Sequence, residues 1–192
     1  MAKNPAQVAQ TKKNLKDAFW ILYKEKRIDK ISIKEITDKG GYNRGTFYLY
    51  YKDVYDILEQ IEDELLNSLD DVSESMIKFL ISSQDYLEDY NKFLEYFRVN
   101  NEYISVLLGE NGDAYFQSKY KDMLKSHIKK HINMNALEYS EDTVDFSLEF
   151  FISGLLGLIL YYLAKHKEPD LDVLTKITKT IIGQSGIGKF LK

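Results

Sequence analysis

The sequence predicts an all-α protein, and three observations lead to that class. Apolar residues recur at helical spacing along most of the 192 residues, residues that start and stop helices separate these stretches, and no segment alternates as a β-strand does. We expect about nine helices. We expect two domains, a three-helix domain over residues 1–52 and a helical domain over residues 53–192.

The first predicted helix runs from Thr11 to Arg27. Residues 1–10 carry no clear pattern and are expected to form a loose arm. The apolar residues of the helix follow the spacing i, i+3, i+4 and i+7: Leu15, Ala18, Phe19 and Leu22. This stripe should pack across the two short helices that follow.

Residues 32–52 predict those two short helices and the turn between them. Ser32 and Glu35 form a capping box, Gly40-Gly41 ends the first helix, and Asn43 caps a second one. Two helices of about two turns each, joined by a short glycine turn, form a helix-turn-helix. Spacing alone also fits an ordinary helical hairpin.

The charge of the chain is divided unevenly. Residues 1–52 hold 12 Lys or Arg and 5 Asp or Glu, a net +7, whereas the other 140 hold 14 and 25, a net −11. Screening limits electrostatic attraction to about 10 Å at ordinary salt, so a phosphate backbone would respond to the local field. The division favours nucleic-acid binding by the first domain, although a chance distribution on solvated helix faces is the alternative.

The second domain begins with Asp53 as a cap. No Pro or Gly lies between Lys52 and Gly109, so this helix is expected to join the two domains rigidly. Its apolar side comprises Val54, Ile57, Leu58, Ile61, Leu65 and Leu69. Further helical segments are predicted at Val72–Asn100, Ala114–Met134 and Glu141–Lys165, and a final amphipathic helix after Pro169 carries Leu171, Leu174, Ile177 and Ile181.

The longest apolar run spans 14 residues, Phe150–Leu163. A membrane-spanning helix needs about 20, so we expect a buried helix and no membrane partner. Gly154 and Gly157 would let another backbone approach closely. The surplus apolar surface favours contact with a second subunit, and deep burial within one subunit is the alternative.

The sequence indicates no enzyme and no cofactor. It has no Cys, its histidines lack a placed Ser or carboxylate partner, and it has no signal peptide, which fits a cytoplasmic protein. Residues 183–189, GQSGIGK, match the GxxxxGK phosphate loop formally. We reject this match because a helix precedes it and Phe190 follows the lysine.

His127 and His131 stand four residues apart on one predicted helix, the spacing of a two-histidine metal site. No third ligand is evident, although Asp122 or Glu138 can be proposed. The pair continues an apolar stripe, so a position beside a pocket, or an ordinary boundary position, is favoured. We predict no metal.

The order of these elements resembles the DNA-binding domain of the TetR/AcrR family of bacterial transcriptional regulators. The resemblance covers about residues 10–60 and rests on S-I-K-E-I-T, G-G and N-R-G-T-F-Y-x-Y-Y-K-D. It implies a homodimer joined through the two C-terminal helices, an unknown small-molecule effector bound in the C-terminal domain, and recognition helices in successive major grooves of double-stranded DNA.

The resemblance also implies which residues touch DNA. Arg44 is suited to a guanine edge, and the hydroxyls of Thr46, Tyr48 and Tyr50 are suited to phosphates. The full set of matching positions is Ser32, Lys34, Asn43, Arg44, Thr46, Tyr48, Leu49, Tyr50 and Lys52, with Phe47 and Tyr51 at core positions.

Two positions depart from the family pattern. Leu49 stands where a polar or aromatic residue is usual, and it can offer only apolar contact. Val54 stands where the family commonly has a lysine that contacts a DNA phosphate. The loss of one phosphate contact lowers the slope of log affinity against log salt concentration by about 0.9.

Our hypothesis is a ligand-responsive repressor acting on a palindromic operator. A helix-turn-helix adaptor or co-activator controlled by a partner protein is the alternative. The candidate effector-binding residues are Tyr90, Phe93, Phe97, Tyr120, His127 and Phe150, although core packing explains most of the aromatic ones equally well.

Overall fold

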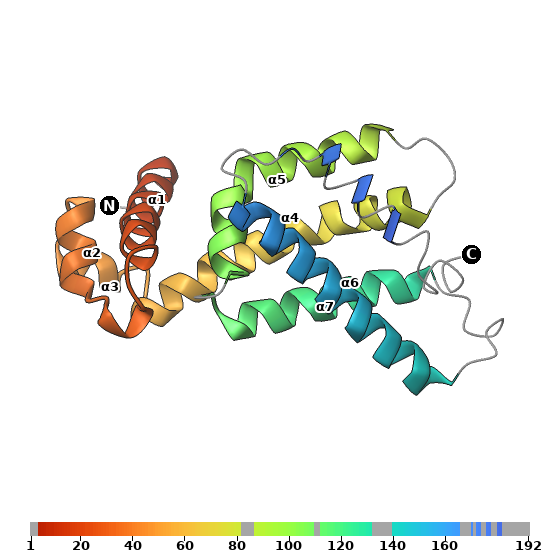
Figure 1. The fold of residues 1–192 in the computed structure, drawn as a ribbon. Coiled ribbons are helices and arrows are strands. Elements are labelled where there is room, and N and C mark those ends of the chain that lie inside the picture. Colours follow the sequence, from red (N-terminus) through yellow and green to blue (C-terminus); the bar gives the residue numbers. More distant parts are fainter. Residues whose placement is uncertain are drawn as a thin grey trace. The chain divides into compact units, whose positions relative to one another are not determined.

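The computed structural model describes residues 4–81, 87–109, 112–131, 140–165, 170, 172–173, 176–177 and 180–181. All regular structure in these residues is helical, which confirms the predicted class. They contain seven α-helices and one short 3-10 helix, fewer than the nine expected (Figure 1). In the last predicted helix, residues 172–173, 176–177 and 180–181 are helical. The chain forms two compact units, Met1–Asn67 and Ser68–Lys192.

The first unit contains α1 (Pro5–Tyr23), a 3-10 turn (Ile28–Lys30), α2 (Ile33–Gly40), α3 (Arg44–Tyr48) and the start of α4 (Val54–Ile81). Its apolar core draws on every α-helix. The side chains with no exposed surface are Leu15, Phe19, Ile36, Phe47 and Ile57. The predicted stripe on α1 is therefore confirmed.

Helix α1 begins earlier than we predicted, so the expected loose arm over residues 1–10 is wrong from Pro5 onwards. The Asn4 side chain accepts a hydrogen bond from the Ala6 amide at 3.1 Å. Proline suits the first helical position because it has no amide to satisfy there. The helix also ends earlier, at Tyr23 and not at Arg27.

Helix α4 contributes to both units. Asp53 caps it as predicted, since its Oδ1 accepts from the amides of Tyr55 and Asp56 at 2.8 and 2.9 Å. Its apolar side packs in the first unit through Ile57, Leu58 and Ile61, and Leu69 is buried in the second unit. These buried turns explain why the first compact unit extends beyond Lys52.

The second unit also contains α5 (Leu87–Leu107), α6 (Ala114–Lys130) and α7 (Glu141–Lys165). Asp113 caps α6 through the amides of Tyr115 and Phe116. Helix α7 contacts both α5 and α6. The core residues that these three helices supply are Ile104, Leu107, Phe116, Tyr120, Ile128, Val144, Leu148, Phe151, Ile152 and Leu156.

Candidate nucleic-acid interface

Helix α2 has the predicted capping box. The Ser32 hydroxyl accepts from the Glu35 amide at 3.3 Å, and Glu35 Oε2 accepts from the Ser32 amide at 3.0 Å. The same oxygen accepts from the Ser32 hydroxyl at 2.8 Å, and Lys26 Nζ reaches Glu35 Oε1 at 2.6 Å. The hydrogen bond from Lys26, together with those from Ser32, lowers the pKa of Glu35 to about 2. The Ser32 hydroxyl proton is thus used within the cap and is not directed at a phosphate.

The turn after α2 is held by the backbone and by α1. Gly41 has φ of 75°, the left-handed conformation that glycine adopts without a side-chain penalty, and the Tyr42 amide donates to the Thr37 carbonyl at 2.8 Å. The side-chain amide of Asn14 on α1 donates to the Tyr42 hydroxyl at 2.9 Å. The start of α3 is therefore fixed relative to α1.

Helix α3 is shorter than predicted, five residues instead of about two turns. Asn43 caps it as expected, because its Oδ1 accepts from the amide and the hydroxyl of Thr46 at 2.8 and 3.2 Å. The side-chain oxygen of Asn43 and the hydroxyl proton of Thr46 are thus engaged with each other. Asn43 retains its amide NH₂ as a donor for an outside acceptor.

Two aromatic side chains anchor α3 and the turn after it. Phe47 is fully buried and Tyr51 is 2 % exposed, with ring centroids 5.5 Å apart. The Tyr51 hydroxyl donates to the carbonyl of Lys12 on α1 at 3.3 Å, and burial raises the pKa of Tyr51. Both residues occupy the core positions that the sequence predicted.

The opposite side of α3 faces outward. Arg44 is exposed, and Tyr48 and Leu49 are 59 % and 62 % exposed. Lys52 is exposed as well, while Tyr50 is half-buried. This surface offers a guanidinium, two hydroxyls, an ammonium and one apolar side chain, a set suited to phosphates and base edges.

Two further exposed residues lie on the helices before and after α3 in the chain. Lys34 is exposed on α2 but paired with Asp38 at 2.5 Å, so it must leave that ion pair to reach a phosphate. Tyr55, which we did not predict, is 56 % exposed at the start of α4. In the sequence, Tyr55 is an aromatic residue two positions after a helix cap, and this pattern alone does not indicate a role in DNA binding.

The predicted effector residues occupy different environments. Tyr120 and His127 are buried on α6, and burial raises the pKa of Tyr120 to about 12. Phe150 is 84 % exposed and is not among the residues that line the cavity described below. The side chains of the other three candidates lie outside the described residues: Tyr90, Phe93 and Phe97.

A cavity of about 200 Å³ lies in the second unit. Its lining residues are Leu108, Gln117, Lys121, Ser153, Leu156, Gly157 and Leu160, none of which we predicted. Lys121 Nζ lies 2.8 Å from Ser153 Oγ and 3.1 Å from Glu149 Oε1. Hydrogen bonds from Lys125, Lys121 and Ser153 lower the pKa of Glu149 to about 2. The cavity thus combines leucine side chains with a cation at one wall.

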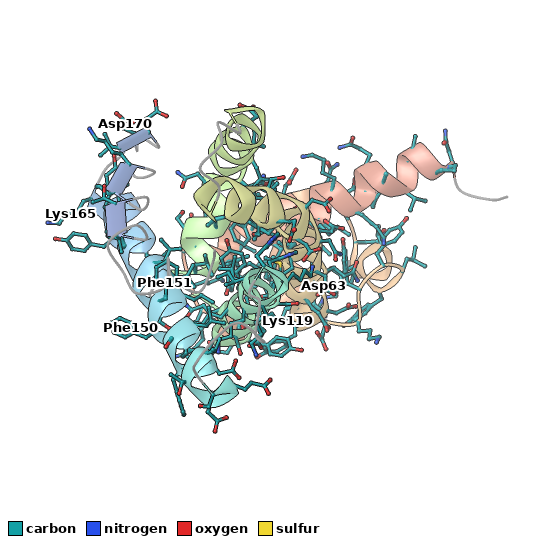
Figure 2. All side chains as sticks on the ribbon, turned by 90° about the vertical axis from the view of Figure 1, so that its right-hand side faces the viewer. Asp63, Lys119, Phe150, Phe151, Lys165 and Asp170 are labelled. Atoms are coloured by element: carbon teal, nitrogen blue, oxygen red, sulfur yellow. The ribbon has the colours of Figure 1, made fainter. Side chains whose placement is uncertain are left out.

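Helix α7 has an exposed apolar face. Figure 2 shows Phe150 on the outer side of the helix and Phe151, which is 9 % exposed, on the side of the neighbouring helices. Phe146 and Tyr161 are 76 % and 60 % exposed, and a side chain at exposed Gly154 would meet no atom within 4 Å. Our prediction of a buried helix is therefore wrong for this face.

The length and composition of residues 141–162 would by themselves also suit a membrane span. The segment has a mean hydropathy of 1.7, and 24 % of its most apolar window is buried. Before Phe150, the apolar residues Val144, Phe146 and Leu148 alternate with polar ones.

These features define a helix-turn-helix protein with a second, all-helical unit. A model of the C-terminal region of TetR-type transcriptional regulators matches residues 84–184, more than half of the chain. The chain belongs to the TetR family of transcriptional regulators.

Two relatives agree with this assignment. An uncharacterized HTH-type transcriptional regulator of Bacillus subtilis strain 168, YxbF, is 25 % identical over 136 residues, which are 65 % of this chain and 33 % of that protein. The chain thus matches about a third of the length of this relative. A TetR transcriptional regulator from Streptococcus agalactiae 2603V has the same fold, with a TM-score of 0.62 at 20 % identity over 92 % of this chain and 96 % of the other.

Proposed function

We propose that this regulator is a cytoplasmic homodimeric repressor that binds a palindromic operator and leaves it when a small molecule binds the C-terminal domain. The single observation that supports DNA binding is that α3 has one buried side and one exposed side. Phe47 and Tyr51 fix it to the core, while Arg44, Tyr48 and Leu49 face outward. Residues 1–52 would supply the DNA contacts and residues 53–192 the effector and dimer contacts.

Dimerisation is supported by the exposed face of α7. Phe146, Phe150, Gly154, Gly157 and Tyr161 follow one another at spacings of four, four, three and four, so they share one side of the helix. Neither glycine is needed for packing in its own subunit, because an added side chain would contact nothing. Small residues between exposed aromatics suit a close helix-to-helix contact with a second copy, and two-fold symmetry then implies a palindromic operator.

Further support comes from the final helical segment. Val173, Ile177 and Ile181 are 43 %, 37 % and 44 % exposed and are spaced four residues apart. This second apolar stripe is available to join α7 in the dimer contact. Burial of both stripes in a dimer would cover apolar surface that α7 and the final segment otherwise expose to water.

Effector binding is supported by the cavity lined by Lys121, Gln117 and Ser153 together with leucines. Ligand pockets commonly measure about 300–1,000 Å³, so a cavity of this size fits a small ligand or widens on binding. We expect the second domain to have a DNA-bound and a released arrangement. A ligand changes the equilibrium between these two arrangements only as far as it binds one more tightly than the other.

The test is selection of bound fragments from genomic DNA by the purified chain, followed by salt-dependent affinity for the enriched fragment. We expect an inverted repeat and tight binding that weakens steeply with salt. The absence of any enriched sequence at low salt would contradict the operator and the regulator function together.

A second experiment addresses the control signal. Small molecules that release the enriched fragment from the protein should bind the chain without DNA as well, because coupling between two sites is reciprocal. If only a protein captured from the host releases the DNA, then control by a partner protein replaces control by a small molecule.

A further inference from the structure

A cluster of two histidines and two carboxylates joins α4 to α6 in the second unit. His127 and His131 lie four residues apart on α6 and at its end, and Asp70 and Glu74 have the same spacing on α4. His127 Nε2 lies 2.7 Å from Asp70 Oδ1, and His127 Nδ1 lies 2.6 Å from Glu74 Oε2. His131 Nε2 lies 3.1 Å from the other oxygen of Glu74. The two helices are therefore linked by three contacts between imidazoles and carboxylates.

A neutral His127 ring cannot donate a hydrogen bond to both Asp70 and Glu74. A neutral imidazole carries one N–H, so only one ring nitrogen can donate. If Nε2 donates to Asp70, the 2.6 Å contact between Nδ1 and a Glu74 oxygen needs either a proton on Nδ1 or, with the two atoms moved apart, a metal ion bound by both. Lys130 Nζ lies 3.2 Å from the same nitrogen, so one cation already approaches this point.

The geometry points to a binding site for a divalent transition-metal ion of the zinc type, with His127 Nδ1, His131 Nε2 and the Glu74 carboxylate as ligands. Imidazole nitrogen and carboxylate oxygen are ligands that zinc takes, and three protein ligands leave a fourth position for water. Asp70 is the outer partner: it accepts from the Nε2–H of His127 and so leaves Nδ1 free to bind the ion. This arrangement of carboxylate, histidine and metal recurs in zinc proteins.

Binding of an ion requires that side chains at the edge of the cluster leave their present contacts. Within the described residues no three such side chains already surround a common point as an assembled metal centre does. The side chains of Glu74 and His131 are 25 % and 23 % exposed, and Lys130 is exposed, so all three have room to turn. His127 is 5 % exposed and serves as the fixed member. Our prediction of no metal rested on the lack of a third ligand, and in the present proposal Glu74 takes that place from a distant helix.

The test uses the full chain, freed of metal by a chelator and titrated with Zn²⁺ by calorimetry. We expect one ion per chain and release of protons, which is measured by repeating the titration in buffers of different ionisation enthalpy. Co²⁺ provides a second probe, because a four-coordinate cobalt site absorbs visible light. A proton held alone between His127 and Glu74 would give neither signal, and that result would overturn the proposal.

Variants with partly exposed positions test the ligand assignment without unfolding the core. Glu74→Gln and His131→Gln should each weaken Zn²⁺ binding by at least about 100-fold, and Asp70→Asn, at the outer position, by about 10- to 100-fold. Lys130→Met should strengthen binding by at least about fivefold, since it removes a competing positive charge. A purely structural cluster would not show this gain.

Two matched controls complete the design. His166→Gln removes the remaining histidine of the chain, and Asp122→Asn removes a carboxylate on α6 that makes none of the described contacts of the cluster. Both should bind Zn²⁺ as the parent chain does. Equal losses in the controls and in Glu74→Gln would show non-specific binding and would also overturn the proposal.

Discussion

The outer side of α3 and the outer side of α7 both expose large apolar or aromatic residues, but their surroundings differ. Around α3, Tyr48 and Leu49 are exposed beside Arg44 and Lys52, in the part of the sequence that carries a net +7. Along α7, Phe146 and Phe150 are more exposed still, at 76 % and 84 %, and lie in line with glycines.

The comparison shows that exposure alone does not identify a partner. Exposed aromatics among cations and hydroxyls suit a phosphate backbone, because each polar group finds a charged or hydrogen-bonding counterpart. Exposed aromatics among glycines suit a second helix, because close packing and loss of apolar surface from water are the available gains. The same residue types therefore support two different proposals.

The largest expected effect is the difference in stability between a substitution on the buried side of α3 and one on its exposed side. Phe47→Ala should lower the free energy of unfolding of the first unit by about 3–5 kcal/mol, because it opens a cavity under α3. Tyr48→Ala, one residue along and exposed, should change stability by no more than about 0.5 kcal/mol. Urea unfolding followed by signals from the first unit measures both. Equal losses would show that Tyr48 also belongs to the core.

The next effect concerns the face of α7. Phe150→Asp should raise the dissociation constant of the dimer by roughly 30-fold, which corresponds to about 2 kcal/mol, because a charge replaces an aromatic anchor. Tyr115→Asp is the control, since Tyr115 is 60 % exposed on α6 and lies off that face. Sedimentation at several protein concentrations measures the change. An unchanged dimer in Phe150→Asp would place the contact elsewhere.

A smaller effect distinguishes two cations at the DNA surface. Arg44→Ala should reduce the preference for the operator over a variant base by about 1–3 kcal/mol, whereas Lys52→Ala should weaken binding to all DNA and lower the salt slope by about 0.9. Competition binding with matched duplexes at several salt concentrations gives both quantities. If Arg44→Ala left the base preference unchanged, its direct contact with a base would be excluded.

The smallest effect concerns the cap of α2. The pKa of Glu35 is lowered from 4.5 to about 2, so its charged form stabilises the fold above pH 4.5 and that contribution is lost as the pH falls toward 2. Glu35→Gln should therefore flatten the acid dependence of stability in this window. Glu149→Gln should have the same effect in the second unit, where hydrogen bonds from Lys125, Lys121 and Ser153 lower the pKa of Glu149 to the same value, so unfolding is followed separately in the two units. Unfolding at pH 2 to 6 provides the measurement, and an unaltered profile in Glu35→Gln would contradict the role of the cap.

Local signals in the sequence predicted the helix boundaries that depend on neighbouring residues. Ser32 with Glu35, Gly41 and Asn43 act within four positions of the backbone groups that they satisfy, so their pattern is visible in the chain. Asn4 followed by Pro5 is a signal of the same kind that we did not use. By contrast, α3 ends after five residues, which no neighbouring Gly or Pro explains.

Features that depend on distant residues were not predictable from the sequence. The carboxylates that face His127 are 53 and 57 positions away, so the pair of histidines seemed to lack further ligands. The exposed position of Phe150 was hidden for a different reason. Helix α7 is apolar on nearly all sides, so its spacing does not distinguish the inner face from the outer one.

The shortness of α3 has a consequence for how the first unit opens. A five-residue helix is too short to persist alone in water, so it depends on the burial of Phe47 and Tyr51 in the core and on the hydrogen bonds with α1 at Asn14 and Lys12. Its amide hydrogens should therefore exchange with solvent at the rate set by separation of α1, and not by local fraying. In effect, the surface proposed to meet DNA has no stability of its own, and any change that loosens α1 removes it as a whole.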